Sequence, residues 1–197
     1  MSLIKNIFPF PVLDTMLEDW EGCKDEIKSL IKKELNTEML VAKEATYTTN
    51  GTFVCSSALI NCPKTKSQVE ALLKIFADEV GIKELMLTDS WINQYEYQQF
   101  LPPHNHLPHQ VTGTIFIDIP PNGGEFFFSR PSVDTDQILL RDGYTKVSEY
   151  SIPAQIIIPI EGQILVFMSN LYHASAPVKT PGFLRYTMAF NANCRVD

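Results

Sequence analysis

From residue 84 onward the sequence is a series of short runs with the composition of β-strands, separated by turns rich in Pro, Gly and Asn. Runs this short and this evenly spaced favour a barrel or a two-sheet roll over an open sheet. A polar stretch at 130–144 interrupts them and is expected to form an excursion or lid over the sheet. The expected strands are 84–99, 111–119, 125–129, 145–158, 163–168 and 183–191.

Before residue 84 the pattern is different, because apolar residues recur with the spacing of amphipathic helices. Two such helices are expected, at 19–35 and at 66–80. Ser67 and Glu70 fit a capping box at the start of the second helix, and Gly81 directly follows its end.

An extended strand at 7–17 and a hairpin around Asn50-Gly51 complete the expected elements of this region. Helices packed on one side of a β body make an α+β fold. We expect a single domain over 1–197, in which 1–82 form a helical and hairpin flank and 83–197 form a jelly-roll core.

Charge and composition exclude several classes of function. The net charge is −7, which argues against nucleic acid as a partner, because phosphate contacts need clustered Lys and Arg. No apolar run approaches the roughly 18 residues that span a bilayer, and the N-terminus lacks a secretory signal pattern. We therefore expect a cytoplasmic protein with no membrane contact. None of the four cysteines forms a CxxC pair, so reduced thiols are expected.

The placement of the histidines points to a functional site, since three of the four fall at 104, 106 and 109. In a strand, side chains two residues apart point to the same side, so His104 and His106 could share a metal ion. His173 follows the strand expected at 163–168 and could reach the same place. The alternative is that the three clustered histidines lie on a solvated loop without a role.

A longer pattern surrounds these histidines. The H-x-H is followed by a strand and the turn Gly123-Gly124, then by Pro159 and Gly162 before another strand, and then by His173 and Arg185. This order resembles the Fe(II)/2-oxoglutarate-dependent dioxygenase superfamily, in particular its prolyl-hydroxylase-like branch and small oxygenases with an H-x-H motif. The resemblance covers residues 91–193 and implies a double-stranded β-helix (jelly-roll).

The resemblance also implies individual roles. His104 and His173 correspond to the two histidine ligands of Fe(II). Arg185 corresponds to the base that pairs with the distal carboxylate of 2-oxoglutarate, a task that suits the two parallel hydrogen bonds of a guanidinium. Asn93 and Tyr95 could bond the carboxylates of the co-substrate, as could Asn191, which shares a strand face with Arg185; a structural role for each is the alternative.

His106 departs from the family pattern, which has Asp or Glu at that position. It is either a third ligand, a bystander beside a carboxylate from elsewhere, or a sign of lost activity. The candidate carboxylates are Glu96, Asp118 and Glu125, and His109 could compete for the metal. We favour the ligand role, which gives a three-histidine site.

The expected function is therefore an Fe(II)- and 2-oxoglutarate-dependent dioxygenase. It would hydroxylate a small-molecule or peptide substrate with O2 and release succinate and CO2. One alternative is a cupin-type three-histidine dioxygenase that uses no 2-oxoglutarate, because His104, His106 and Gln110 approach the cupin H-x-H-x3-E pattern. The other is a non-catalytic jelly-roll binding module. Sheet edges would allow a homodimer.

Overall fold

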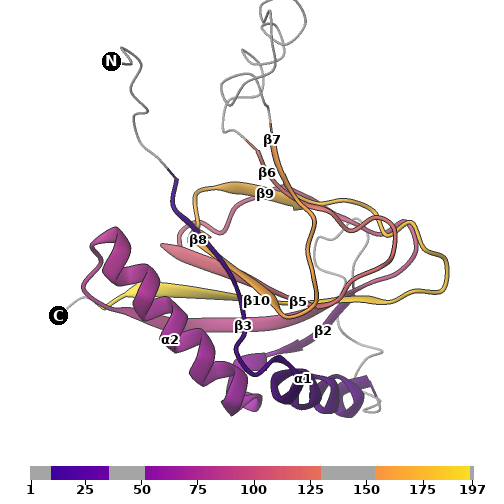
Figure 1. The fold of residues 1–197 in the computed structure, drawn as a ribbon, viewed down its shortest axis with the longest axis horizontal. Coiled ribbons are helices and arrows are strands. Elements are labelled where there is room, and N and C mark those ends of the chain that lie inside the picture. The colour runs from indigo at the N-terminus through magenta and orange to yellow at the C-terminus, as the bar shows by residue number, and fades with distance from the viewer. Residues whose placement is uncertain (1–9, 36–51, 130–153, 196–197) are drawn as a thin grey trace, which may run out of the picture.

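The fold consists of two antiparallel sheets that face one another, with two helices packed on the outside of the larger one (Figure 1). The computed structural model describes residues 10–35, 52–129 and 154–195. The larger sheet has six strands, in the spatial order β1 (Val12–Met16), β8 (Gln163–Met168), β5 (Val111–Asp118), β10 (Arg185–Cys194), β3 (Leu85–Tyr95) and β2 (Thr52–Ser56). The smaller sheet has four, in the order β4 (Leu101–His104), β9 (Tyr172–Ser175), β6 (Phe126–Ser129) and β7 (Ala154–Ile157).

The alternation of side chains along each strand separates two layers of core. In β8, Ile164 and Val166 pack toward the helices, whereas Leu165 and Phe167 pack between the sheets. The helix-side layer includes the buried faces of α1 (Trp20–Leu35) and α2 (Pro63–Val80). The buried cluster between the sheets is largely aromatic and includes Phe116, Phe126, Phe128 and Phe167.

The α+β jelly-roll expected from the sequence is confirmed by this arrangement. The first 82 residues also contribute strands to the larger sheet, since β1 pairs with β8 and β2 pairs with β3. The hairpin around Asn50-Gly51 and the excursion at 130–144 involve residues outside the described part of the chain. Two short strands were not expected from the sequence. β4 lies beyond the strand expected at 84–99, and β9 lies beyond the one expected at 163–168 and includes Ala174, a weak strand former.

The start of α2 differs from the sequence prediction. The helix begins at Pro63, and no side chain at its N-cap, Cys62, forms a capping bond. The carboxylate of Glu26 in α1 instead accepts the backbone N–H groups of Lys64 and Thr65 at 3.1 and 3.0 Å. The capping box at Ser67 and Glu70 was therefore wrong, because a residue 38 positions earlier in the chain serves the first turn.

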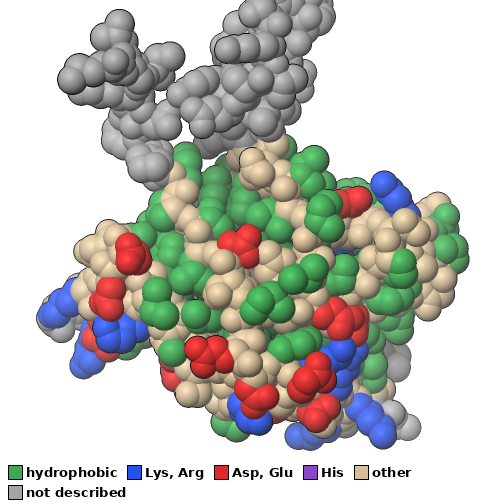
Figure 2. All heavy atoms as spheres, in the orientation of Figure 1, with side chains coloured by type: hydrophobic (Ala, Val, Ile, Leu, Met, Phe, Trp, Pro, Cys, Tyr) green, Lys and Arg blue, Asp and Glu red, His purple; other side chains and the backbone are tan. Residues whose placement is uncertain are grey.

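The end of α2 is as expected. Gly81 has a φ of 77°, and its N–H caps the carbonyl of Ala77. On the face shown in Figure 2, most acidic and basic side chains lie over the helices, whereas the strands above them expose more apolar side chains. No helix in the described ranges combines the length and the apolar character that a membrane span requires.

Candidate metal centre

Two of the histidines lie opposite one another in the smaller sheet. His104 is the last residue of β4 and pairs with His173 of β9. Directly opposed residues of antiparallel strands project to the same face of a sheet. The two ring centroids are 4.3 Å apart, and the His173 side chain is buried. Both imidazoles therefore point into the space between the sheets.

His106 reaches the same place from a loop. β4 ends at His104, so the strand does not continue through His106 as the period-two argument assumed. The loop is instead fastened by backbone hydrogen bonds. The N–H of His106 donates to the carbonyl of Ser169 at 2.9 Å, and the N–H of Ser169 donates to the carbonyl of Gln110 at 3.0 Å. The loop also contains a turn, in which the N–H of His109 donates to the carbonyl of His106 at 3.0 Å.

The three imidazoles form one compact group. Their nearest nitrogens all lie within 4.8 Å of one another, and the Nε2 atoms of His104 and His106 are 3.1 Å apart. Among the described residues, this is the one group of three or more His, Cys, Asp or Glu side chains arranged closely enough to hold a metal ion.

Aromatic side chains pack against two of the three imidazoles. The Trp91 ring stacks on His106 with centroids 5.6 Å apart and planes inclined by 20°. Phe126 stacks on His173 at 5.6 Å, and Phe167 meets His173 edge-on at 4.9 Å. The rings are thus held on several sides, which fixes their orientation before any ligand arrives.

Backbone carbonyls select the tautomer of two of the rings. The Nδ1 atoms of His104 and His173 lie 3.0 Å from the carbonyl oxygens of Pro102 and Leu171, each two residues earlier in the chain. A carbonyl oxygen only accepts, so Nδ1 carries the proton and donates it. The lone pair of each imidazole is therefore on Nε2, the atom that faces the group.

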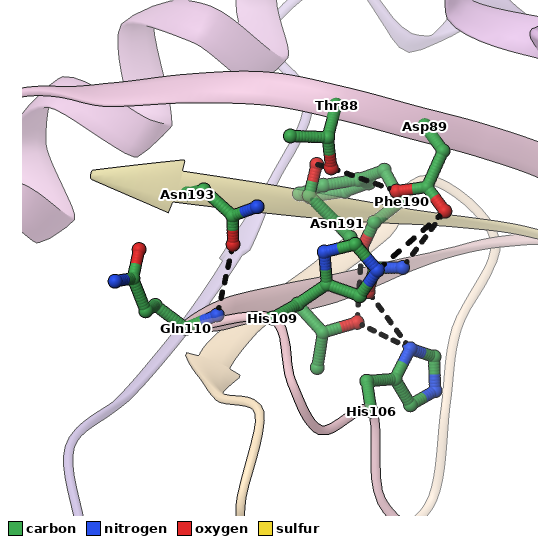
Figure 3. A network of polar contacts seen from close by, with 9 residues as sticks. Thr88, Asp89, His106, His109, Gln110, Phe190, Asn191 and Asn193 are labelled. Carbon is green, nitrogen blue, oxygen red and sulfur yellow. Dashed lines mark hydrogen bonds and ion pairs between the residues drawn. The ribbon is translucent and has the colours of Figure 1, made fainter. Parts of the chain in front are cut away.

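His106 has the same tautomer, fixed by side chains. Its Nδ1 is 2.8 Å from Oδ1 of Asn191 (Figure 3). The same Nδ1 is 3.1 Å from Oγ1 of Thr112. The Thr112 hydroxyl donates to the carbonyl of Phe190 at 2.9 Å, so its oxygen is left to accept from His106. Sequence reasoning did not identify Thr112, because only the pairing of β5 with β10 brings it to this ring.

Burial keeps all three imidazoles neutral at physiological pH. It lowers the pKa of His104, lowers the pKa of His106 to about 4 and lowers the pKa of His173 to about 3. The neutral imidazole is the form that binds a metal ion.

These features fit a divalent metal ion. With the protons on Nδ1, the Nε2 lone pairs of His104 and His106 face each other across 3.1 Å with no proton between them, an arrangement that a cation relieves. Two nitrogens each about 2.1 Å from one ion and at right angles are about 3.0 Å apart. Three imidazoles on one side of an ion leave its remaining positions open to other ligands.

Arg185 lies at the start of β10 and is 2% exposed. Its Nη2 donates to Oγ of Ser175 at 2.8 Å, and its guanidinium lies 4.0 Å above the centre of the Tyr95 ring. Its buried Nε has no partner, and no ion pair joins it to a carboxylate in the described part of the chain. Burial lowers the pKa of Arg185, and the charge of Glu125 acts in the opposite direction. A buried cation with a free donor fits an anionic ligand such as a carboxylate.

The three other residues expected to contact the co-substrate lie in two different places. Tyr95 forms the platform under Arg185, and Asn93 is half-buried on the same strand, opposite Thr187 of β10. Asn191 contacts His106, which separates it from Arg185 at the other end of the strand.

The candidate carboxylates are not part of the histidine group. Asp118 forms an ion pair with Lys28 of α1, Glu96 is exposed, and Glu125 lies near Arg185. His109 is also outside the group, with its Nε2 4.0 Å from Oδ2 of Asp89.

A comparison with known families identifies the family to which this chain belongs. Residues 89–191, just over half of the chain, match the sequence profile of a family described as "Putative 2OG-Fe(II) oxygenase". The chain belongs to this 2OG-Fe(II) oxygenase family. The matched segment contains the three histidines and Arg185. A comparison with curated protein sequences finds no match.

Solved structures similar to this oxygenase share its fold. A Pseudomonas putida prolyl-4-hydroxylase is 11% identical, with 94% of each chain covered and a TM-score of 0.63. A Trichoplax adhaerens prolyl hydroxylase, solved with a peptide fragment of hypoxia inducible factor, is 12% identical (93% of this chain, 83% of that chain, TM-score 0.62). HygX from Streptomyces hygroscopicus, solved with nickel, 2-oxoglutarate and hygromycin B, is also 12% identical (93% and 82%, TM-score 0.62).

Family membership confirms the expected chemistry. The chain is an Fe(II)- and 2-oxoglutarate-dependent oxygenase, and Fe(II) and 2-oxoglutarate are its cofactor and co-substrate. Neither the cupin-type enzyme without 2-oxoglutarate nor the non-catalytic module gains support from the comparisons.

Proposed function

We propose that His104, His106 and His173 bind Fe(II) through their Nε2 atoms and that no protein carboxylate is a ligand. The observation that carries this proposal is the convergence of three Nε2 lone pairs whose Nδ1 protons are already engaged elsewhere. Three neutral ligands would leave the full charge of +2 on the ion. Such a centre favours a dianionic co-substrate more than a site with a carboxylate ligand does.

We also propose that Arg185 pairs with the distal carboxylate of 2-oxoglutarate. Its unpartnered Nε and the lack of an ion pair to a described carboxylate support this role. Ser175 and Tyr95 would hold the guanidinium in place, and Asn93 would lie beside the co-substrate. Asn191 is better placed to act on His106 than on 2-oxoglutarate.

The substrate would be a small molecule or a peptide, as in the structures solved with hygromycin B and with a peptide fragment. When bound, Fe(II) supplies the oxidising chemistry, in which O2 hydroxylates a C–H bond while 2-oxoglutarate becomes succinate and CO2. The chain's own residues orient the ligands, and Trp91, Phe126 and Phe167 exclude water. The homodimer and the cytoplasmic location stay predictions.

The test is 2-oxoglutarate turnover combined with metal counting. Wild-type protein with one equivalent of Fe(II) should convert 2-oxoglutarate to succinate slowly even without its substrate. His104→Ala and His173→Ala should neither retain one metal ion per chain nor produce succinate above the level of free Fe(II). Full metal retention by the double variant would refute the ligand assignment, whatever its activity.

A further inference from the structure

The three histidines differ in what selects their tautomers. His104 and His173 face backbone carbonyls, which can only accept a hydrogen bond. His106 faces the Asn191 amide, which presents an acceptor or a donor depending on which way it is turned. If the amide were turned by 180°, its N–H group would face Nδ1 of His106. Only the longer contact to Oγ1 of Thr112, at 3.1 Å, would then favour the proton on Nδ1. The ring would become a mixture of tautomers, and the form with the proton on Nε2 could not bind the metal through that atom.

Asp89 determines which way the amide is turned. Nδ2 of Asn191 donates to Oδ2 of Asp89 at 3.1 Å, and a carboxylate oxygen only accepts (Figure 3). The NH2 group must therefore face Asp89, which leaves Oδ1 facing His106. Asp89 is itself held, since the hydroxyl of Thr88 donates to its other oxygen, Oδ1, at 2.8 Å.

We call the chain of contacts from Asp89 through Asn191 to His106 the relay. The pairing of strands brings its three residues together. Asn191 and Asp89 are paired residues of β10 and β3, and Asn191 is also paired with Thr112 of β5. The backbone register thus places the carboxylate, the amide and the hydroxyl in one row beside His106. The Asp89 side chain is 49% exposed, so solvent screens its charge, and its effect on His106 comes from the orientation of the amide rather than from long-range attraction.

We propose that Asp89 and Asn191 are positioning residues that hold His106 in the tautomer able to bind the metal ion. The proposal rests on the three-histidine site put forward above. It assigns a task to a carboxylate that has no direct contact with the metal-binding nitrogens. In this oxygenase His106 occupies the position where the family pattern has an acidic ligand. The relay keeps the Nε2 atom of His106 free of a proton, so that it can bind the metal ion.

The test first removes the Asp89 carboxylate and then replaces Asn191 with a residue that needs no orienting partner. Asp89→Ala frees the Asn191 amide to turn, and we expect the zinc affinity to fall by about tenfold or more, the usual size of such indirect effects. Asn191→Leu should lower the zinc affinity by at least as much. In the double variant Asp89→Ala/Asn191→Asp, a carboxylate faces His106 directly and needs no orienting partner, so zinc affinity should return to within about threefold of wild type.

A second readout is independent of the metal. Long-range ¹H–¹⁵N correlation spectra of the metal-free protein should show His106 protonated on Nδ1 in the wild type and in the double variant, and as a mixture of tautomers in Asp89→Ala. If the wild type shows this tautomer but binds no zinc, the proposed metal site fails while the relay stands.

Two controls match these substitutions. Asn193→Leu changes the same residue type two positions along β10, where the amide accepts from the backbone N–H of Gln110 instead of a histidine. Glu96→Ala removes an exposed acid just beyond the other end of β3. Both should keep wild-type zinc affinity and the wild-type tautomer. The relay is overturned if Asp89→Ala leaves affinity and tautomer unchanged, or if the double variant is as weak as Asp89→Ala.

Discussion

At the scale of single residues, substitutions of the four histidines should affect metal binding to different degrees. His104→Ala and His173→Ala should abolish stoichiometric metal binding, because these rings come from paired strands and, among the described residues, the group contains only one further ligand, His106. His106→Ala should weaken binding more than His109→Ala, since His109 lies outside the group. Competition with a chelator gives the affinities. The opposite ranking of His106 and His109 would show that the third ligand is wrongly assigned.

The low pKa values of the imidazoles lead to a prediction about pH. With pKa values near 4 for His106 and near 3 for His173, these rings bind no protons that a metal would have to displace above pH 6. Zinc affinity should therefore change by less than about threefold between pH 8 and pH 6. Three histidines with the ordinary pKa of about 6.5 would lose more than roughly 50-fold over the same interval. A loss of that size would mean that the site is open to water.

The sequence predicted which histidines lie together but not how they are oriented. The H-x-H spacing placed His104 and His106 together, although the reason was partly wrong because the strand ends at His104. Thr112 of β5 and Asn191 of β10 contact His106, and Asp89 of β3 contacts Asn191. Their contacts depend on strand register, which no local pattern in one sequence specifies.

At the scale of elements, α2 packs on the larger sheet through one face, and two aliphatic side chains of equal size test this. Leu73 is 1% exposed and Ile75 is 52% exposed. Leu73→Ala should lower the free energy of unfolding by roughly 2–5 kcal/mol, because it leaves a cavity against the sheet. Ile75→Ala should cost less than about 1 kcal/mol. Urea unfolding gives both values, and equal costs would contradict the packing described here.

The helices were predictable as elements because their apolar periodicity is local. The end of a helix was predictable only where the residue that caps it lies next to it in the sequence. Gly81 ends α2 as expected, whereas the start of α2 depends on Glu26 from α1, a contact that the local sequence around Ser67 could not reveal. The short strand β9 was missed for a similar reason, since it is held by β4 and β6 on its two sides rather than by its own propensity.

At the scale of the whole molecule, the buried neutral histidines should make the metal-free protein sensitive to acid. The folded-state pKa of His173 is about 3, below its unfolded value near 6.5, so the unfolded chain binds more protons below pH 6.5. Stability is therefore fully present above pH 6.5 and is lost as pH falls toward about 3. Metal-free protein at pH 5 should be less stable than at pH 7 by at least about 2 kcal/mol, measured by urea unfolding. Equal stability at the two pH values would mean that these rings are not buried as neutral groups.

The proposed site brings the metal ion and 2-oxoglutarate together between the two sheets, with Arg185 facing the distal carboxylate. Anaerobic calorimetric titration of the Fe(II)-loaded protein with 2-oxoglutarate tests this directly. The wild type should bind one equivalent. Arg185→Met should retain the metal but bind 2-oxoglutarate more weakly by roughly 2–5 kcal/mol, because a carboxylate would be buried without its partner. No binding by the iron-loaded wild type at millimolar 2-oxoglutarate, or equal binding by Arg185→Met, would contradict the claim.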